Sequence, residues 1–350
     1  MSSYTPSIVT KTFSVFPLSV YPGQHDKDNK LQKEIEKHTF PLRSRAQQQD
    51  RNAQLVEKHE DSIVIGVYKV KEYREMMKNT TVYLPTDPLC LNVLLSMMLK
   101  NDLLLPKSTC FQHSKYSVVE LSYHASPDGA LPMLVEPERL DSKLKIHTRN
   151  PIIRTYGEIN NVLAERLSSE NDGHLLLAEL MDTIFYDVFI MQLLKEPEVY
   201  ASKYVLDSSA LTQQQNYNKF MLNLMNQNRF SIRNQAIHNE FNREFIFNYA
   251  RFEQRVMFSK NKCVTDCKDL LEQIEKELSN NESNIFRKNS ADMEENPFTT
   301  TNSPSYLDLK LASYIVPMLS LGVDNDLSCF LEKSCPLSTQ RAKHVISYFS

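Results

Sequence analysis

Glycine is scarce in this chain, with only six residues among 350. No two of them are close together, so the sequence contains no Gly-x-Gly-x-x-Gly turn and no glycine-rich loop that could cradle a phosphate. Nucleotide-dependent chemistry of these classes is therefore not expected. The chain also lacks a basic excess, since its formal net charge is −3. That charge argues against a general nucleic-acid binder, whose footprint is a surplus of lysine and arginine.

Metal-binding spacing is missing as well. None of the six cysteines forms a Cys-x-x-Cys pair with a nearby histidine, so we predict neither a structural zinc site nor any other metal or cofactor. The nine histidines are scattered, and no His-Glu-x-x-His grouping appears. Reduced thiols in a protein that faces the cytosol are the expected state of the cysteines.

Long apolar runs are absent too. No stretch approaches the eighteen or so consecutive apolar residues of a membrane-spanning helix. The first residues lack the basic start and continuous apolar core of a secretory signal, so we expect none. If this protein works at a membrane, we expect it to act from the surface or through a partner.

The first 61 residues are expected to form an N-terminal arm and linker. Residues 1–24 are rich in apolar and aromatic side chains, whereas residues 25–61 carry many charges and glutamines and are typical of a solvated helix followed by a linker. Aromatic residues ahead of any core either pack on the chain's own fold or dock on a partner. The candidate partner-binding residues of this arm are Phe13, Phe16, Pro17, Leu18 and Tyr21.

Residues 62–149 are expected to form a thioredoxin-like domain. A β-branched strand over 62–70 precedes an apolar helix over 87–103, in which Asp87 is the N-cap and Pro88 lies in the first turn. Further strands are expected at 116–123, 131–136 and 143–147, and no helix is evident between the first two of these. A helix is then expected to start with Asn150 as its cap and Pro151 behind it.

Residues 150–350 are expected to form a mostly helical domain. Its most apolar segment, 174–197, predicts a central buried helix, and the polar stretch 279–303 predicts a mobile loop. Ser305 and Asp308 have the spacing of an N-terminal capping pair.

An α/β half followed by an all-α half resembles the glutathione-transferase-like fold. The resemblance rests on the Asp87-Pro88 turn, the Leu131-Pro132 step before a strand, and the Ser305-x-x-Asp308 cap. It implies that Pro132 follows a cis peptide bond.

Transferase chemistry is not expected at the matching positions. A working enzyme of this kind holds a thiolate at the first strand–helix junction, where a helix N-terminus favours an anion. The carboxylate of Asp87 would repel a thiolate, and Thr86 is a poor replacement for the usual donor. Cys90 stands at the second cysteine place of a glutaredoxin-like motif that lacks its first cysteine. Arg149-Asn150 replaces the acidic residue and serine that hold glutathione in the family. These five residues, with Pro88, are interpreted as a degenerate active site.

Several longer stretches resemble the metaxin-like family, in particular its smaller subunits in the fungal mitochondrial sorting and assembly machinery. They are FPLSVYPGQHDKD from Phe16, LQKEIEKHTF from Leu31, LPTDPLCLNVLLSMMLKNDLLLP from Leu84, ALPMLVE from Ala130 and PSYLDLKLASYI from Pro304.

This second resemblance implies a protein without enzymatic activity that lies peripherally on the cytosolic face of the mitochondrial outer membrane. The implied partners are a β-barrel core subunit, a larger metaxin-like subunit, and β-barrel precursors recognised through their C-terminal β-signal. Two other functions stay open on the residues alone. One is a glutathione-dependent transferase-like enzyme, and the other is a translation-associated transferase-like interaction module.

Overall fold

The computed structural model describes most of the chain after residue 34. The described residues are 35–45, 62–75, 79–108, 114–137, 151–170, 172–195, 197–205, 213–244, 249–280, 286, 298, 302–322 and 325–350.

A six-stranded sheet forms the first half of the fold, with the strand order β5-β1-β6-β2-β7-β8. Strands β2 and β6 are parallel, and every other neighbouring pair is antiparallel. The strands are β1 (Thr39–Ser44), β2 (Ile63–Val67), β5 (Leu103–Leu104), β6 (Tyr116–Glu120), β7 (Met133–Glu136) and β8 (Ile152–Arg154).

An antiparallel hairpin, β3 (Val70–Glu75) with β4 (Thr80–Pro85), follows β2 and leads into helix α4 (Pro88–Asn101). Helix α4 thus lies on the connection between the two parallel strands, as expected for a thioredoxin-like half. Only a single 3₁₀ turn, η1 (Tyr123–Ala125), lies between β6 and β7. The absence of a helix there agrees with the sequence, and the peptide bond before Pro132 is cis.

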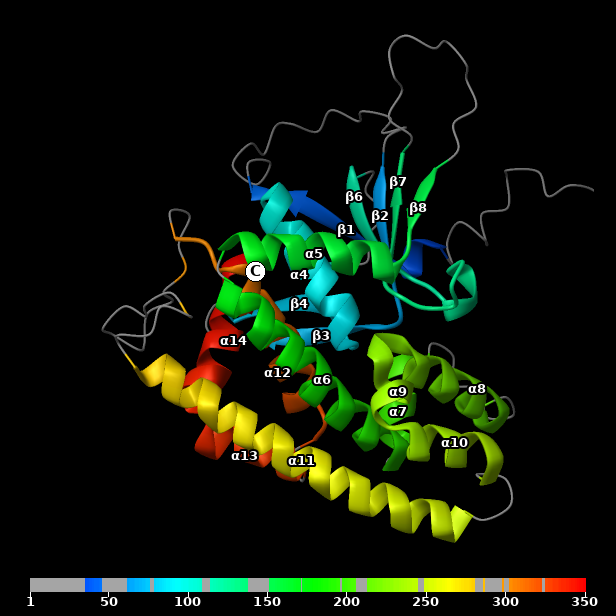
Figure 1. The fold of residues 1–350 in the computed structure, drawn as a ribbon. Helices are drawn as coiled ribbons and strands as arrows, with labels where there is room; N and C mark the ends of the chain where they lie inside the picture. The colour runs from blue at the N-terminus through cyan, green and yellow to red at the C-terminus, as the bar shows by residue number, and fades with distance from the viewer. Residues whose placement is uncertain are drawn as a thin grey trace, which may run out of the picture.

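The second half is helical and packs below the sheet (Figure 1). Its elements are α5 (Tyr156–Glu170), α6 (Asp172–Lys195), α7 (Pro197–Tyr204), α8 (Gln213–Asn226), η2 (Gln227–Arg229), α9 (Phe230–Arg233), α10 (Gln235–Glu244), α11 (Tyr249–Ser279), α12 (Tyr306–Leu319), α13 (Asp326–Ser334) and α14 (Pro336–Phe349). The mixed α/β half followed by a helical half is the architecture that the sequence predicts.

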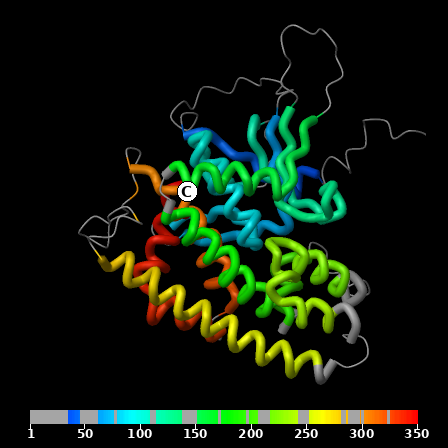
Figure 2. Tube along the Cα trace, viewed as in Figure 1, coloured from blue at the N-terminus to red at the C-terminus, as the bar shows by residue number. Residues whose placement is uncertain are grey.

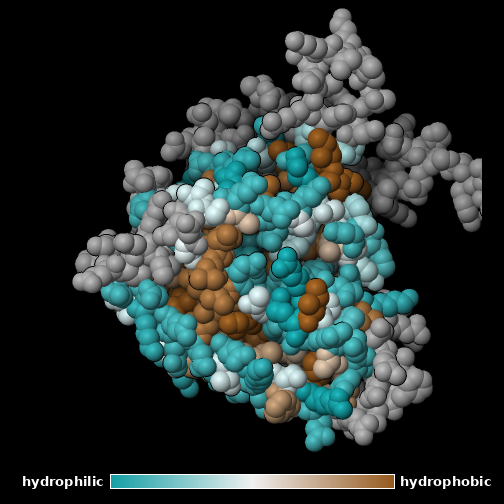
Figure 3. All heavy atoms as spheres, viewed as in Figure 1, coloured by the Kyte–Doolittle hydropathy of each residue, from teal (hydrophilic) through white to brown (hydrophobic). Residues whose placement is uncertain are grey.

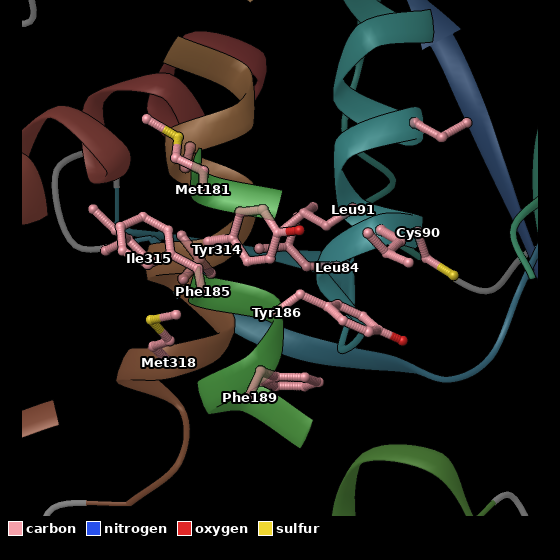
Figure 4. Close-up of a cluster of buried hydrophobic side chains, with 14 of the residues drawn as sticks. Leu84, Cys90, Leu91, Met181, Phe185, Tyr186, Phe189, Tyr314, Ile315 and Met318 are labelled. Atoms are coloured by element: carbon pink, nitrogen blue, oxygen red, sulfur yellow. The ribbon is translucent and has the colours of Figure 1, made fainter. Parts of the chain in front are cut away.

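Helices α6 and α12 form the centre of the core. Helix α12 contacts α4, α6 and α14, so it joins the sheet half to the helical half. Figure 4 shows apolar side chains from three elements meeting there: Phe185 from α6, Ile315 from α12 and Leu91 from α4. All three side chains are fully buried. The apolar segment that predicts a central helix is therefore α6.

The structure corrects three details of the expected secondary structure. The solvated helix and linker expected over 25–61 miss β1, in which Phe40 and Leu42 alternate into the core. The strand expected over 62–70 ends at Val67, because the chain turns there into the β3–β4 hairpin.

The third correction concerns the start of α5. The helix expected from Asn150 begins at Tyr156, because the β-branched pair Ile152-Ile153 forms strand β8 beside β7. Asn150, Arg149 and the strand expected at 143–147 lie outside the described residues. The division of the chain at residues 61 and 149 stays a prediction.

Most of the loop expected over 279–303 also lies outside the described residues, but Phe286 and Phe298 are described and buried. Both rings lie against the guanidinium of Arg341, at 5.3 Å from each ring centroid. Arg341 on α14 also bonds Asp308 Oδ1 through Nε at 2.6 Å. The other carboxylate oxygen of Asp308 accepts hydrogen bonds from Ser305, which completes the capping box of α12.

Replacing Arg341 with leucine should destabilise the protein strongly. The change leaves the buried Asp308 carboxylate without its cation, which costs about 3–5 kcal/mol of the free energy of unfolding. Urea denaturation measures this loss. The control is Arg154→Leu, which breaks the exposed Arg154–Glu136 pair and should cost less than about 1 kcal/mol. Equal losses in the two variants would contradict the role given to the buried pair.

Candidate functional site

The candidate site is the N-terminus of α4, where Asp87 caps the helix. Its backbone is extended (φ −90°, ψ 133°) and its Oδ1 accepts a hydrogen bond from the backbone N–H of Cys90 at 2.9 Å. Pro88 occupies the first helical position, where its missing N–H and fixed φ cost nothing. The Thr-Asp-Pro sequence therefore sets the start of α4 by local chemistry alone.

The second carboxylate oxygen of Asp87 is bound by the helical half. Oδ2 accepts a hydrogen bond from the hydroxyl of Tyr204, at the end of α7, at 2.7 Å. Asp87 is 0% exposed. Burial raises the pKa of this carboxyl, whereas the hydrogen bonds from Tyr204 and Cys90 oppose the rise. Both carboxylate oxygens of Asp87 therefore have donors inside the protein.

Tyr68, directly after β2, closes the same region from the sheet side. Its hydroxyl accepts hydrogen bonds from the backbone N–H of Leu131 at 3.1 Å and from Gln227 Nε2 at 2.6 Å. Leu131 is the residue whose cis peptide bond leads to Pro132. The amide beside the cis proline is thus occupied by a side chain of the same protein. The ring of Tyr68 packs edge-on against Tyr204 and Phe220.

Thr86 has no hydroxyl proton to offer a ligand. Its Oγ1 donates to the carbonyl of Lys203 on α7, and its N–H donates to the carbonyl of Lys69 at 2.9 Å.

Cys90 cannot act as a nucleophile in this setting either. Burial, reinforced by the nearby Asp87, raises the pKa of its thiol well above the ordinary value, and a buried thiol of this kind is inert.

The structure brings together four of the expected site residues, Thr86, Asp87, Pro88 and Cys90, and places Pro132 beside them. It adds Tyr68, Tyr204 and Gln227, which the sequence did not single out. These three are distant from Asp87 in the chain and show no motif, so only a three-dimensional structure could identify them. Their hydrogen bonds occupy the polar groups beside the N-terminus of α4 from both the sheet half and the helical half. We call this region, formed by Thr86, Asp87, Tyr68, Leu131, Tyr204 and Gln227, the closed junction.

A family model and a curated relative match this chain. Residues 4–136 match the family described as SAM35, subunit of SAM complex. A curated relative, the sorting assembly machinery 35 kDa subunit of Saccharomyces cerevisiae, is 26% identical over 381 aligned positions that span 100% of this chain and 99% of the relative. Both matches support a SAM complex subunit of the metaxin-like kind. The family match includes the sheet strands up to β7 and the start of α4 at Asp87.

The arm residues Phe13, Phe16, Pro17, Leu18 and Tyr21 fall within the segment that matches the SAM35 family but outside the residues that the structure describes. They stay candidates for partner contact. Among the described residues, no helix is long and apolar enough to cross a membrane. Within the same residues, no group of three or more His, Cys, Asp or Glu side chains is placed to hold a metal ion.

Lys203 is a second buried ionisable group at the junction. Its Nζ donates to the carbonyl of Pro317 at 3.1 Å and to Ser320 Oγ at 2.6 Å, at the C-terminal end of α12. Burial lowers its pKa from 10.5 to about 7, with Lys71 adding to the shift and Asp87 opposing it. A neutral amine retains two N–H groups, so both hydrogen bonds persist in either protonation state.

Replacing Tyr204 with phenylalanine should lower the free energy of unfolding by about 1–3 kcal/mol, because it leaves Asp87 Oδ2 buried without a donor. Urea denaturation at neutral pH measures the loss. The matched control is Tyr200→Phe on the same helix. Tyr200 stacks on Tyr204 at 5.9 Å, and its hydroxyl makes no hydrogen bond with the described residues. A Tyr204→Phe variant no less stable than this control would contradict the junction described above.

Stability should rise with pH in a way that depends on Lys203. Its folded-state pKa of about 7 lies below the unfolded-state value of 10.5, so the unfolded chain binds the extra proton between these values. Unfolding therefore becomes harder as pH increases through this window. Relative to Lys203→Met, the wild-type chain should gain about 2 kcal/mol of unfolding free energy from about pH 7 to pH 9. Parallel pH profiles for the two proteins would mean that the lysine titrates normally.

Proposed function

We propose that this chain is a peripheral, non-enzymatic subunit of the mitochondrial outer-membrane sorting and assembly machinery. It binds a β-barrel core subunit beside a larger metaxin-like subunit on the cytosolic face. There it helps to recognise the C-terminal β-signal of β-barrel precursors and supports their insertion. The full-length similarity to a sorting assembly machinery subunit of yeast supports the complex and the membrane.

The observation that carries the proposal is the closed junction, in a chain that is similar to a SAM complex subunit. In the transferase-like fold this place is where a substrate thiol would be held. Here the carboxylate of Asp87, the amide of Leu131 and the hydroxyl of Thr86 all bond to other groups of the protein. Because these groups are bonded within the protein, we assign the proposed partner contacts to its outer surface.

The proposed subunit would help a precursor strand to pair its backbone at the β-barrel. A β-strand that enters lipid must first pair its backbone, because each unsatisfied amide in the hydrocarbon costs several kcal/mol. A subunit that holds a precursor strand near the barrel until pairing begins would lower that cost. This role needs binding groups and no catalytic ones.

The two alternatives have less support. A glutathione-dependent enzyme would need an accessible donor at the α4 N-terminus, where Asp87 is fully buried. A translation-associated module would usually carry a basic patch, and the chain's formal net charge is −3.

Affinity purification tests the proposal. The tagged full-length chain is recovered from digitonin-solubilised mitochondria, and the co-purified proteins are identified by mass spectrometry. Recovery of an outer-membrane β-barrel protein with a second metaxin-like chain is expected. Recovery with translation factors, or alone from the cytosol, would overturn the proposal.

The N-terminal arm gives a sharper version of this test. The double variant Phe16→Ala with Leu18→Ala should stay folded and lose much of its recovery with the barrel subunit, because aromatic and aliphatic anchors dominate interface energies. The control is Ile232→Ala, which truncates a residue that is 75% exposed on α9. Loss of folding in the double variant would instead place the arm in the core. Unchanged recovery would exclude it as a contact.

A further inference from the structure

The two edges of the six-stranded sheet differ sharply. At one edge, both residues of β5 are buried, and the next amide, Leu105 N–H, donates to the carbonyl of Phe349 at 2.8 Å. The C-terminus of the chain lies beside this edge (Figure 2). Strand β4 of the separate hairpin is also tied, because Tyr83 N–H donates to the carbonyl of Pro106 at 2.9 Å.

The opposite edge is strand β8, beside which the described residues place no further strand. Every residue of β8 is exposed, and within the described residues it pairs only with β7. Figure 1 places β8 at the outer side of the sheet, next to β7. A strand edge of this kind presents a row of backbone donors and acceptors, which is a template for one more strand.

The side chains of β8 are apolar on both faces of the sheet. Ile152 is 40% exposed and Ile153 is 43% exposed. Consecutive residues of a strand point to opposite faces, so an added strand would meet one isoleucine on each face. Figure 3 shows hydrophobic atoms at this end of the sheet. Arg154, paired with Glu136 at 2.8 Å, ends the apolar segment.

We propose that the outer edge of β8 binds an extended segment of an incoming β-barrel precursor, which adds to the sheet as a seventh strand. The inference rests on the function proposed above and names the surface that recognises the precursor. Only an extended chain matches the row of backbone groups, because a helix uses its own amides internally. The amphipathic strand of a barrel also supplies apolar side chains against the two isoleucines.

The short length of β8 suits a transient contact. Pro151 precedes the strand and Arg154 ends it, and proline and charge at an edge limit how far strands can pair. Three residues provide only a few backbone hydrogen bonds, so the bound strand can be released to the barrel.

Fluorescence anisotropy tests this edge. The probe is a labelled synthetic peptide with the sequence of the last strand of an outer-membrane β-barrel protein, titrated with the full-length chain. The double variant Ile152→Lys with Ile153→Lys should bind about tenfold more weakly or worse, because lysine at an edge opposes strand pairing. The charge-matched control is Ile232→Lys with Phe258→Lys, at residues that are 75% and 77% exposed on helices. It should bind as the wild type does.

Modified peptides test the same contact on the wild-type chain, so the result does not depend on the folding of a variant. Two versions of the peptide are made, each N-methylated at alternate amides so that one of its two edges cannot pair through the backbone. The version methylated on the edge that faces β8 should lose its affinity for the wild-type chain, and the other version should keep it. Equal binding of both methylated peptides, or equal binding by the edge variant, would overturn the β8 assignment and leave the proposed function intact.

Two further outcomes would also contradict the inference. If the wild-type chain does not bind the unmodified peptide, precursor recognition by this subunit fails together with the β8 site. If sedimentation shows a wild-type dimer that the edge variant abolishes, the occupant of β8 is a second copy of the chain and not a precursor.

Discussion

The hydrogen bond between Asp87 and Tyr204 is the constraint on which the fold depends. It joins the N-terminus of α4, in the sheet half, to the end of α7, in the helical half, at 2.7 Å. Neighbouring bonds cross the same boundary: Gln227 reaches Tyr68, and Thr86 reaches the carbonyl of Lys203. Separating the two halves would also break the ring contacts that Tyr68 makes with Tyr204 and Phe220. The two halves are therefore held together by hydrogen bonds at the junction where the sequence predicts a degenerate active site.

This arrangement leaves the polar groups at the start of α4 bonded within the protein. Burial raises the pKa of the Cys90 thiol, and the only carboxylate at the helix start already has two donors. The partner contacts that we propose are therefore placed on the outer surface. The sheet offers an edge for them, because β5 is sealed by the C-terminal residues whereas Ile152 and Ile153 of β8 remain exposed. The β8 edge is the surface on which we propose that a precursor strand binds.

Much of the fold could be predicted from the sequence, and the reason is local chemistry. Asp87-Pro88 and Ser305-x-x-Asp308 set helix starts by caps that need no distant partner, and the apolar run of α6 implies its burial. Strand β1 escapes prediction from the sequence because few apolar residues, Phe40 and Leu42 among them, mark it within a polar segment. The start of α5 was placed too early because Asn150-Pro151 resembles a helix start, whereas pairing with β7 makes Ile152–Arg154 a strand. Tyr204 and Gln227 could not be found, since their role is set by tertiary contacts alone.

The most direct test of the closed junction is titration calorimetry of the full-length chain with reduced glutathione at millimolar concentration. The account predicts no saturable heat, because the groups that would hold the tripeptide are bonded within the protein. Saturable binding by the wild-type chain that is lost in Asp87→Ala would contradict the account. Turnover of a model electrophile by the same chain would then support a glutathione-dependent enzyme.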